Sequence, residues 1–161
     1  MERFGKLKYF TIVTGQTINA DKDFIRNLHK HRPNLQKVSS VEKCDFILVF
    51  CPVVSRAGTD IEAALKNLND KSTTKPAVLV VLHHTFDPDS TVPESSRSVF
   101  RENTLTVDCL FHEDRGLLQC RKNDTALEKI TEYLKLQLEY EKLAAVSLVG
   151  LCADIKAKVL D

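Results

Sequence analysis

The chain has 161 residues, a length that suits one domain whose core can form without metal ions or disulfide bonds. Its 23 basic and 22 acidic residues nearly cancel, which argues against nucleic acid and against an anionic membrane surface as partners. Five cysteines without CxxC or Cys/His spacing indicate reduced thiols, and the lack of a long apolar segment predicts a cytoplasmic protein outside the membrane.

The first forty residues predict a strand, a helix and a second strand. Tyr9 to Val13 is rich in strand-forming residues and leads into a loop that carries Gly15 and Gln16. One glycine falls short of the GxGxxG and P-loop patterns, so it does not establish phosphate binding. A helical pattern comes next in the chain, and after it Leu35 to Ser39 predicts the second strand. Only residues 40–44 lead to the next strand, which is short for a crossover.

The middle of the chain predicts a buried central strand that leads into a loop and a helix. Phe46 to Cys51 is apolar without alternation, as in a parallel strand that is covered on both faces. Ser55, Gly58 and Thr59 supply turn and cap residues, and helical spacing starts at Asp60. Ligands of open α/β sheets bind beyond the carboxyl ends of such strands, so this loop is the predicted binding site.

The remaining pattern predicts two more parallel strands and a closing helix. Ala77 to Leu82 is a second continuous apolar run, and Leu105 to Phe111 follows after a long polar loop. Leu117 to Cys120 suits a short antiparallel return strand. Asp124 is placed to cap the last helix of the domain, whose apolar residues recur at helical spacing.

These elements predict a flavodoxin-like α/β domain over residues 1–138, with an open, mostly parallel five-stranded sheet of order 2-1-3-4-5 and helices on both faces. Residues 139–161 continue the helical spacing as a C-terminal amphipathic extension. Its apolar stripe must be covered by the same domain, by a second copy of the chain or by a membrane surface. We favour the second copy, which predicts a homodimer or larger homo-oligomer.

Two carboxylates lie at the start of the helix after the central strand. Asp60 and Glu62 point about 200° apart around a helix axis, so at most one faces the predicted site, and Glu62 is the candidate. The alternative interpretation is that both acids stabilise the positive end of the helix dipole, as first-turn acids commonly do.

This region resembles the nucleoside 2-deoxyribosyltransferases and their nucleotide N-glycosidase relatives. The resemblance lies in an apolar strand, then Gly58-Thr59 and Glu62 on the helix, then Lys75-Pro76 before an apolar strand. The central strand also resembles that of TIR domains, in which a helix glutamate cleaves NAD. The chain departs from the transferases at Arg56-Ala57, where they carry an aspartate. The whole chain also resembles a group of vertebrate proteins, a likeness that implies no activity.

The resemblance implies that Glu62 attacks the anomeric carbon of a nucleoside, nucleotide or NAD, and that His83 or Asp87 protonates the departing base. Ribose or phosphate oxygens would be held by Gly15, Gln16, Ser55, Arg56, Gly58 and Thr59. No separate cofactor is predicted. The loop after the first strand lacks the Ser/Thr-rich sequence with which flavodoxins bind the flavin phosphate. The alternative function is a non-catalytic interaction domain that assembles through residues 139–161.

Other site chemistries are weaker in the sequence. His83-His84 and the pair His112-Glu113 suggest a metal, but adjacent strand residues point to opposite faces, so no metal site is predicted. Cys51 is expected to be a buried, inert thiol, and a G-x-S-x-G elbow is missing. The basic run of residues 29–32 lacks interleaved aromatics and suits a solvated helix end.

Overall fold

The structure, a computed structural model, describes residues 5–54 and 56–139. In chain order the elements are β1 (Leu7–Val13), α1 (Ala20–His31), β2 (Leu35–Lys37), the 3₁₀ turn η1 (Val41–Lys43), β3 (Phe46–Val53), α2 (Ala57–Lys71), β4 (Ala77–His84), the 3₁₀ turn η2 (Ser95–Ser98), β5 (Thr104–His112), β6 (Gly116–Leu117), α3 (Arg121–Tyr133) and the π-helical turn η3 (Leu134–Glu139).

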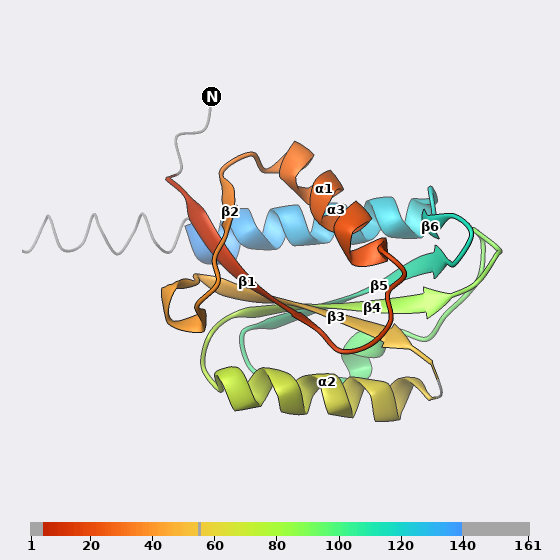
Figure 1. The fold of residues 1–161 in the computed structure, drawn as a ribbon, viewed down its shortest axis with the longest axis horizontal. Helices are drawn as coiled ribbons and strands as arrows, with labels where there is room; N and C mark the ends of the chain where they lie inside the picture. Colours follow the sequence, from red (N-terminus) through yellow and green to blue (C-terminus); the bar gives the residue numbers. More distant parts are fainter. Residues whose placement is uncertain (1–4, 55, 140–161) are drawn as a thin grey trace, which may run out of the picture.

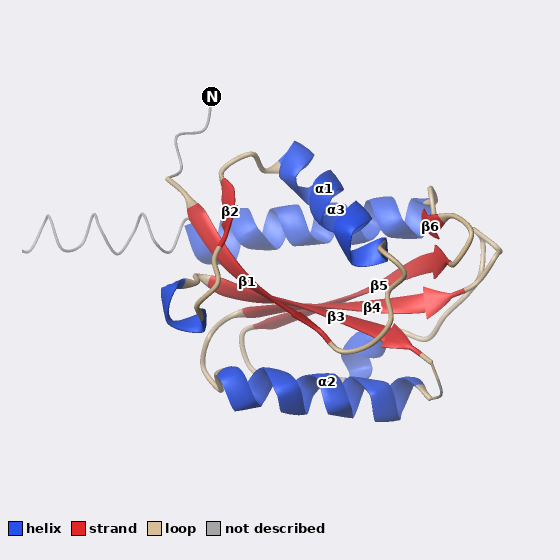
Figure 2. Cartoon of the chain, viewed as in Figure 1, coloured by secondary structure: helices blue, strands red, loops and turns tan. Residues whose placement is uncertain are grey.

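Within the described residues the strands form one open sheet in the order β2-β1-β3-β4-β5-β6 (Figure 2). β1 to β5 are parallel, and β6 runs antiparallel to β5. The predicted order of the first five strands is confirmed, and the count of five is wrong: the antiparallel return strand expected at Leu117–Cys120 joins the sheet as β6, at Gly116–Leu117. Gly116, at a φ of 69°, reverses the chain so that Leu117 pairs with Phe111 and a sixth strand forms.

The short connection from β2 to β3 is explained by the register of β1. β2 ends with Lys37 opposite Tyr9, and β3 begins with Phe46 opposite the same residue. The chain therefore steps sideways past β1 and needs no helix to carry it back along the sheet. Val38 and Val41 pack on the α2 side of the sheet during this step.

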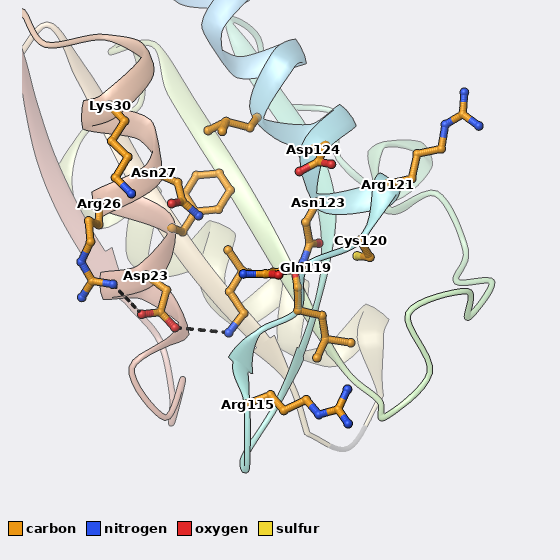
Figure 3. Close-up of a pocket in the computed structure, with 14 residues that line it drawn as sticks. Asp23, Arg26, Asn27, Lys30, Arg115, Gln119, Cys120, Arg121, Asn123 and Asp124 are labelled. Carbon is orange, nitrogen blue, oxygen red and sulfur yellow. Dashed lines mark hydrogen bonds and ion pairs between the residues drawn. The ribbon is translucent and has the colours of Figure 1, made fainter.

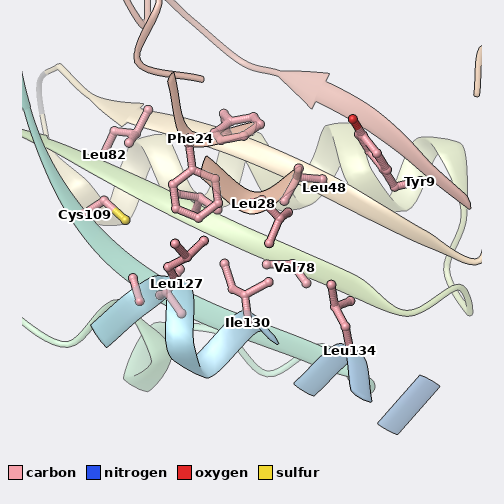
Figure 4. Close-up of a cluster of buried hydrophobic side chains, with 14 of the residues drawn as sticks. Tyr9, Phe24, Leu28, Leu48, Val78, Leu82, Cys109, Leu127, Ile130 and Leu134 are labelled. Atoms are coloured by element: carbon pink, nitrogen blue, oxygen red, sulfur yellow. The ribbon is translucent and has the colours of Figure 1, made fainter. Parts of the chain in front are cut away.

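The sheet separates two apolar layers, with α1 and α3 on one face and α2 on the other (Figure 1). Alternate residues of β3 enter different layers: Phe50 packs against Phe24 of α1, while Val49 lies in the layer that holds Ile61 of α2. Figure 4 shows the first layer, in which side chains of α1 and α3 meet over the strands. Burial on both faces explains why the central runs are apolar without alternation.

Two helices begin earlier than their cap residues suggest. α2 starts at Ala57, which puts Gly58 and Thr59 in its first turn, where the sequence had predicted a loop. α3 starts at Arg121, so Asp124 lies in the first turn and is not the cap. The N-cap residues of both helices make no side-chain cap hydrogen bond, which is why cap chemistry did not mark these boundaries.

Arg101 joins the end of the long β4–β5 loop to the C-terminal end of α2. Its guanidinium donates to Asn69 Oδ1 at 2.9 Å, to Thr104 Oγ1 at 2.9 Å, and to the carbonyls of Ser72 at 3.0 Å and Lys75 at 2.8 Å. Burial lowers the pKa of this guanidinium. One side chain thus joins the end of α2, the approach to β4 and the start of β5.

The described part of the chain ends in a buried ion pair between Arg32, just after α1, and Glu139 of η3. Arg32 is 7% exposed, so the basic run at the end of α1 is not uniformly solvated as predicted. The predicted extension beyond Glu139, and the assembly expected of it, lie outside the described residues. No helix in the described ranges has the length and apolarity to cross a membrane.

Candidate functional site

The loop after β1 packs against the carboxyl end of β3, at the edge of the sheet where the topology predicts a site. Thr14 donates to the Phe50 carbonyl through both its backbone N–H and its Oγ1, each at 3.1 Å. A Cβ placed on Gly15 would lie 3.0 Å from Cγ of Pro52, so glycine permits this close approach. Gln16 beside it is exposed.

The carboxylate that turns back to the β3–α2 loop belongs to Asp60. Its Oδ2 accepts the Val54 N–H at 2.8 Å, which is the helix-start role of the alternative interpretation. Glu62 is exposed on α2, and the described pockets do not include it. Arg56, Gly58 and Thr59 are exposed too, and Ser55 lies outside the described residues. The catalytic role of Glu62 stays a prediction that this geometry does not strengthen.

His83 is buried and bonds to a carboxylate on the neighbouring strand. Its Nε2 lies 2.7 Å from Asp108 Oδ1, and Asp108 also accepts the Ser95 hydroxyl at 2.5 Å and the Ser95 N–H at 3.1 Å. Burial of the Asp108 carboxyl raises its pKa, but the hydrogen bonds from His83 and Ser95 outweigh burial, so the pKa is below its usual value. Asp108 also borders a pocket of about 450 Å³ between the long loop and α3. The hydrogen bonds from Ser95 to Asp108 thus hold the β4–β5 loop against β5, next to this pocket.

The adjacent histidines of β4 do point to different surroundings, as predicted. His83 faces Asp108, whereas His84 is exposed and its ring stacks on His112 at a centroid distance of 4.8 Å. His84, His112 and Glu113 each offer a possible ligand atom within 4.8 Å of the others. The sequence predicts that at most one of His83 and His84 can join His112 and Glu113 in a site. The fold brings His84 to them.

A larger pocket, of about 790 Å³, lies between α1 and the segment that joins β6 to α3 (Figure 3). Its charged lining among the described residues consists of Arg26, Lys30, Arg115, Arg121, Asp23 and Asp124. Arg26 is paired with Asp23 at 3.1 Å, and Arg115 and Arg121 extend outward at the rim (Figure 3). Lys30 is exposed and forms no ion pair within the described residues. The pocket is therefore polar, open and more basic than acidic.

Asn123 holds the first turn of α3 at this pocket. Its Oδ1 accepts the Leu110 N–H at 2.7 Å, and its Nδ2 donates to the Leu110 carbonyl at 2.8 Å and the Leu118 carbonyl at 2.7 Å. The buried amide thereby satisfies backbone groups of β5 and of the segment after β6. Cys120, the N-cap, provides no side-chain cap, so the first amides of α3 have no side-chain acceptor at this position.

The sequence did not identify this pocket, because its residues come from segments that are 85 or more positions apart in places. The sequence pattern predicts a solvated helix end at Lys30 and a turn without a ligand motif at Arg115. The available signal was topological: α3 starts at the carboxyl edge of the sheet, where ligands of such folds bind.

Comparison with known proteins leaves the resemblance to deoxyribosyltransferases and TIR domains a prediction. No protein-family model matches the chain, and no curated protein matches it.

Proposed function

We propose that this protein binds a small phosphate-bearing molecule of nucleotide type in the pocket between α1 and α3. The observation that carries the proposal is the coincidence of a 790 Å³ cavity, an excess of basic side chains and the uncapped start of α3. The volume lies within the range of about 300–1,000 Å³ common for small-molecule sites. Helix N-termini attract anions through their free N–H groups and the helix dipole.

Lys30 has the central role in this proposal. Arg26 is partly neutralised by Asp23, whereas Lys30, on the same side of the pocket, has no ion-pair partner in the described part of the chain. A phosphate between Lys30 and the first turn of α3 would receive charge-assisted hydrogen bonds from both sides. The nucleoside part would lie toward the half-buried apolar residue Leu117.

The proposal extends to binding and not to bond cleavage. The predicted nucleophile Glu62 is exposed on the opposite helix layer from this pocket, and His83 is engaged with Asp108. N-glycosidic cleavage by Glu62 would need a second site on the α2 side.

A thermal-shift titration tests the proposal with ADP, AMP, NAD, FMN and adenosine. A ligand at 100 times its Kd stabilises the native state by about 2.7 kcal/mol. For a chain of this size that corresponds to a rise in Tm of roughly 5–10 °C. We expect phosphorylated ligands to raise Tm, adenosine to have little effect, and added salt to weaken the shift.

The variant Lys30→Glu reverses one charge in the pocket and should abolish most of the shift. Lys66→Glu is the matched control, because Lys66 is an exposed helix lysine on α2, across the sheet. Equal losses in both variants, equal shifts with adenosine and ADP, or no shift with any ligand would each contradict the proposal.

A further inference from the structure

The cluster of His84, His112 and Glu113 arises from the pairing of two strand ends. His84 is the last residue of β4 and lies opposite Phe111 of β5, so His112 is one residue further along the neighbouring strand. Glu113 follows directly, in the turn before β6. The two imidazole rings stack with an interplanar angle of 26°. This edge of the sheet therefore collects two imidazoles and one carboxylate from segments nearly thirty residues apart.

His112 carries a second feature, an unsatisfied ring nitrogen. The residue is 1% exposed, and its Nε2 is buried without a hydrogen-bond partner among the described residues. Its Nδ1 accepts the Asp114 N–H at 3.1 Å. A buried polar nitrogen without a partner destabilises the folded state, so its retention in the core calls for a compensating interaction.

We propose that His84, His112 and Glu113 form a binding site for a divalent transition-metal ion, with Zn²⁺ as the best fit. Two imidazoles and one carboxylate are a donor set of zinc sites that keep a fourth position for water. Imidazole nitrogen also suits Ni²⁺ and Cu²⁺, whereas Mg²⁺ and Ca²⁺ prefer sites made of oxygen. The proposal is independent of phosphate binding at the α1–α3 pocket.

The hydrogen bonds around His112 specify which nitrogen takes the metal. With Nδ1 accepting from Asp114, the neutral ring carries its proton on Nε2. When Nε2 binds the ion, that proton moves to Nδ1 and the Asp114 N–H is displaced. Oδ2 of Asp114 lies 3.8 Å from Nδ1 and can approach to accept the proton. A carboxylate behind a histidine ligand is a common support of zinc sites.

The exposed members of the cluster can make the required adjustment. Tetrahedral zinc bonds of about 2.0–2.1 Å place donor atoms about 3.4 Å apart. One possible donor atom from each residue lies within 4.8 Å of the other two, so closure of that set needs movements of up to about 1.4 Å. His84 and Glu113 are exposed and can rotate, while buried His112 stays in place.

Titration of the full chain with Co²⁺, followed by Zn²⁺ competition, tests the site. We expect one ion per chain, a d–d spectrum typical of nitrogen and oxygen ligands, and displacement by Zn²⁺. Nitrogen-detected NMR should show the His112 proton moving from Nε2 to Nδ1. His84→Ala and Glu113→Gln should each weaken binding more than about tenfold, the lower limit for loss of an outer partner alone.

His31→Ala is the matched control, because His31 is an exposed histidine on α1 whose Nδ1 lies 2.9 Å from the Asn27 carbonyl oxygen. It should bind Co²⁺ like the wild type. The proposal is overturned if no ion binds, if His84→Ala retains wild-type affinity, if His31→Ala loses as much, or if a thiolate charge-transfer band places the ion on cysteine.

Discussion

Replacement of Asn123 should destabilise the part of the fold where β5 and the segment after β6 meet the start of α3. Asn123→Ala removes three buried hydrogen bonds to backbone groups of Leu110 and Leu118. At about 1 kcal/mol for each bond, the expected loss in the free energy of unfolding is about 3 kcal/mol, measured by urea denaturation. Because these bonds fix the first turn of α3, the same variant should also bind ligands of the α1–α3 pocket more weakly.

Asn123→Asp provides the sharper form of this test. An ionised carboxylate can accept from the Leu110 N–H but faces two carbonyl oxygens at 2.7 and 2.8 Å, so its folded-state pKa should be raised. The raised pKa means that the variant gains stability as the pH falls through the folded-state pKa. Gln119→Glu makes the same amide-to-acid change at an exposed neighbour and should show little of this gain. A loss below about 1 kcal/mol in Asn123→Ala, or no gain on acidification of Asn123→Asp, would refute the reasoning.

Four further outcomes follow from the described contacts. Arg101→Ala should cost about 3 kcal/mol of unfolding free energy in urea, since it leaves two carbonyls without their charged donor; an effect no larger than that of an exposed arginine would contradict this role. The lowered pKa of Asp108 means that its stabilising effect is complete above the unfolded pKa of about 3.9 and is lost as the pH falls through the lower folded value. Asp108→Asn should therefore flatten the acid limb of a plot of stability against pH. Gly116→Ala should cost more than about 1–2 kcal/mol, because φ is 69° and the new Cβ would lie 2.5 Å from a carboxylate oxygen of Asp23; thermal melts measure this. Burial raises the pKa of Cys51 to about 11, so iodoacetamide should not label it before unfolding, as mass spectrometry can check.

The order of the strands could be predicted because two apolar runs, Phe46 to Cys51 and Ala77 to Leu82, are continuous. Only a strand covered on both faces tolerates such a run, and the structure buries both runs fully. The helix between them, α2, carries the chain back along the sheet, so the two strands pair in parallel. The thiol state of the four described cysteines also followed from spacing, since all four are free.

The position of the candidate sites depended on contacts that no local pattern contains. The start of α2 at Ala57 decided that Asp60, and not Glu62, turns back to the β3–α2 loop, because a shift of the helix start rotates every later side chain. The pairing of β4 with β5 decided which histidine meets His112.

The sequence alone determined which segments are buried. Buried positions need apolar residues, and these recur with the period of the helix or strand. It did not determine which polar side chains share a cavity. Lys30 and Arg115 line one pocket only after α1 and α3 pack on the same face of the sheet, and His84 meets Glu113 only after two strands align. Such meetings depend on register and helix rotation, which long-range packing sets.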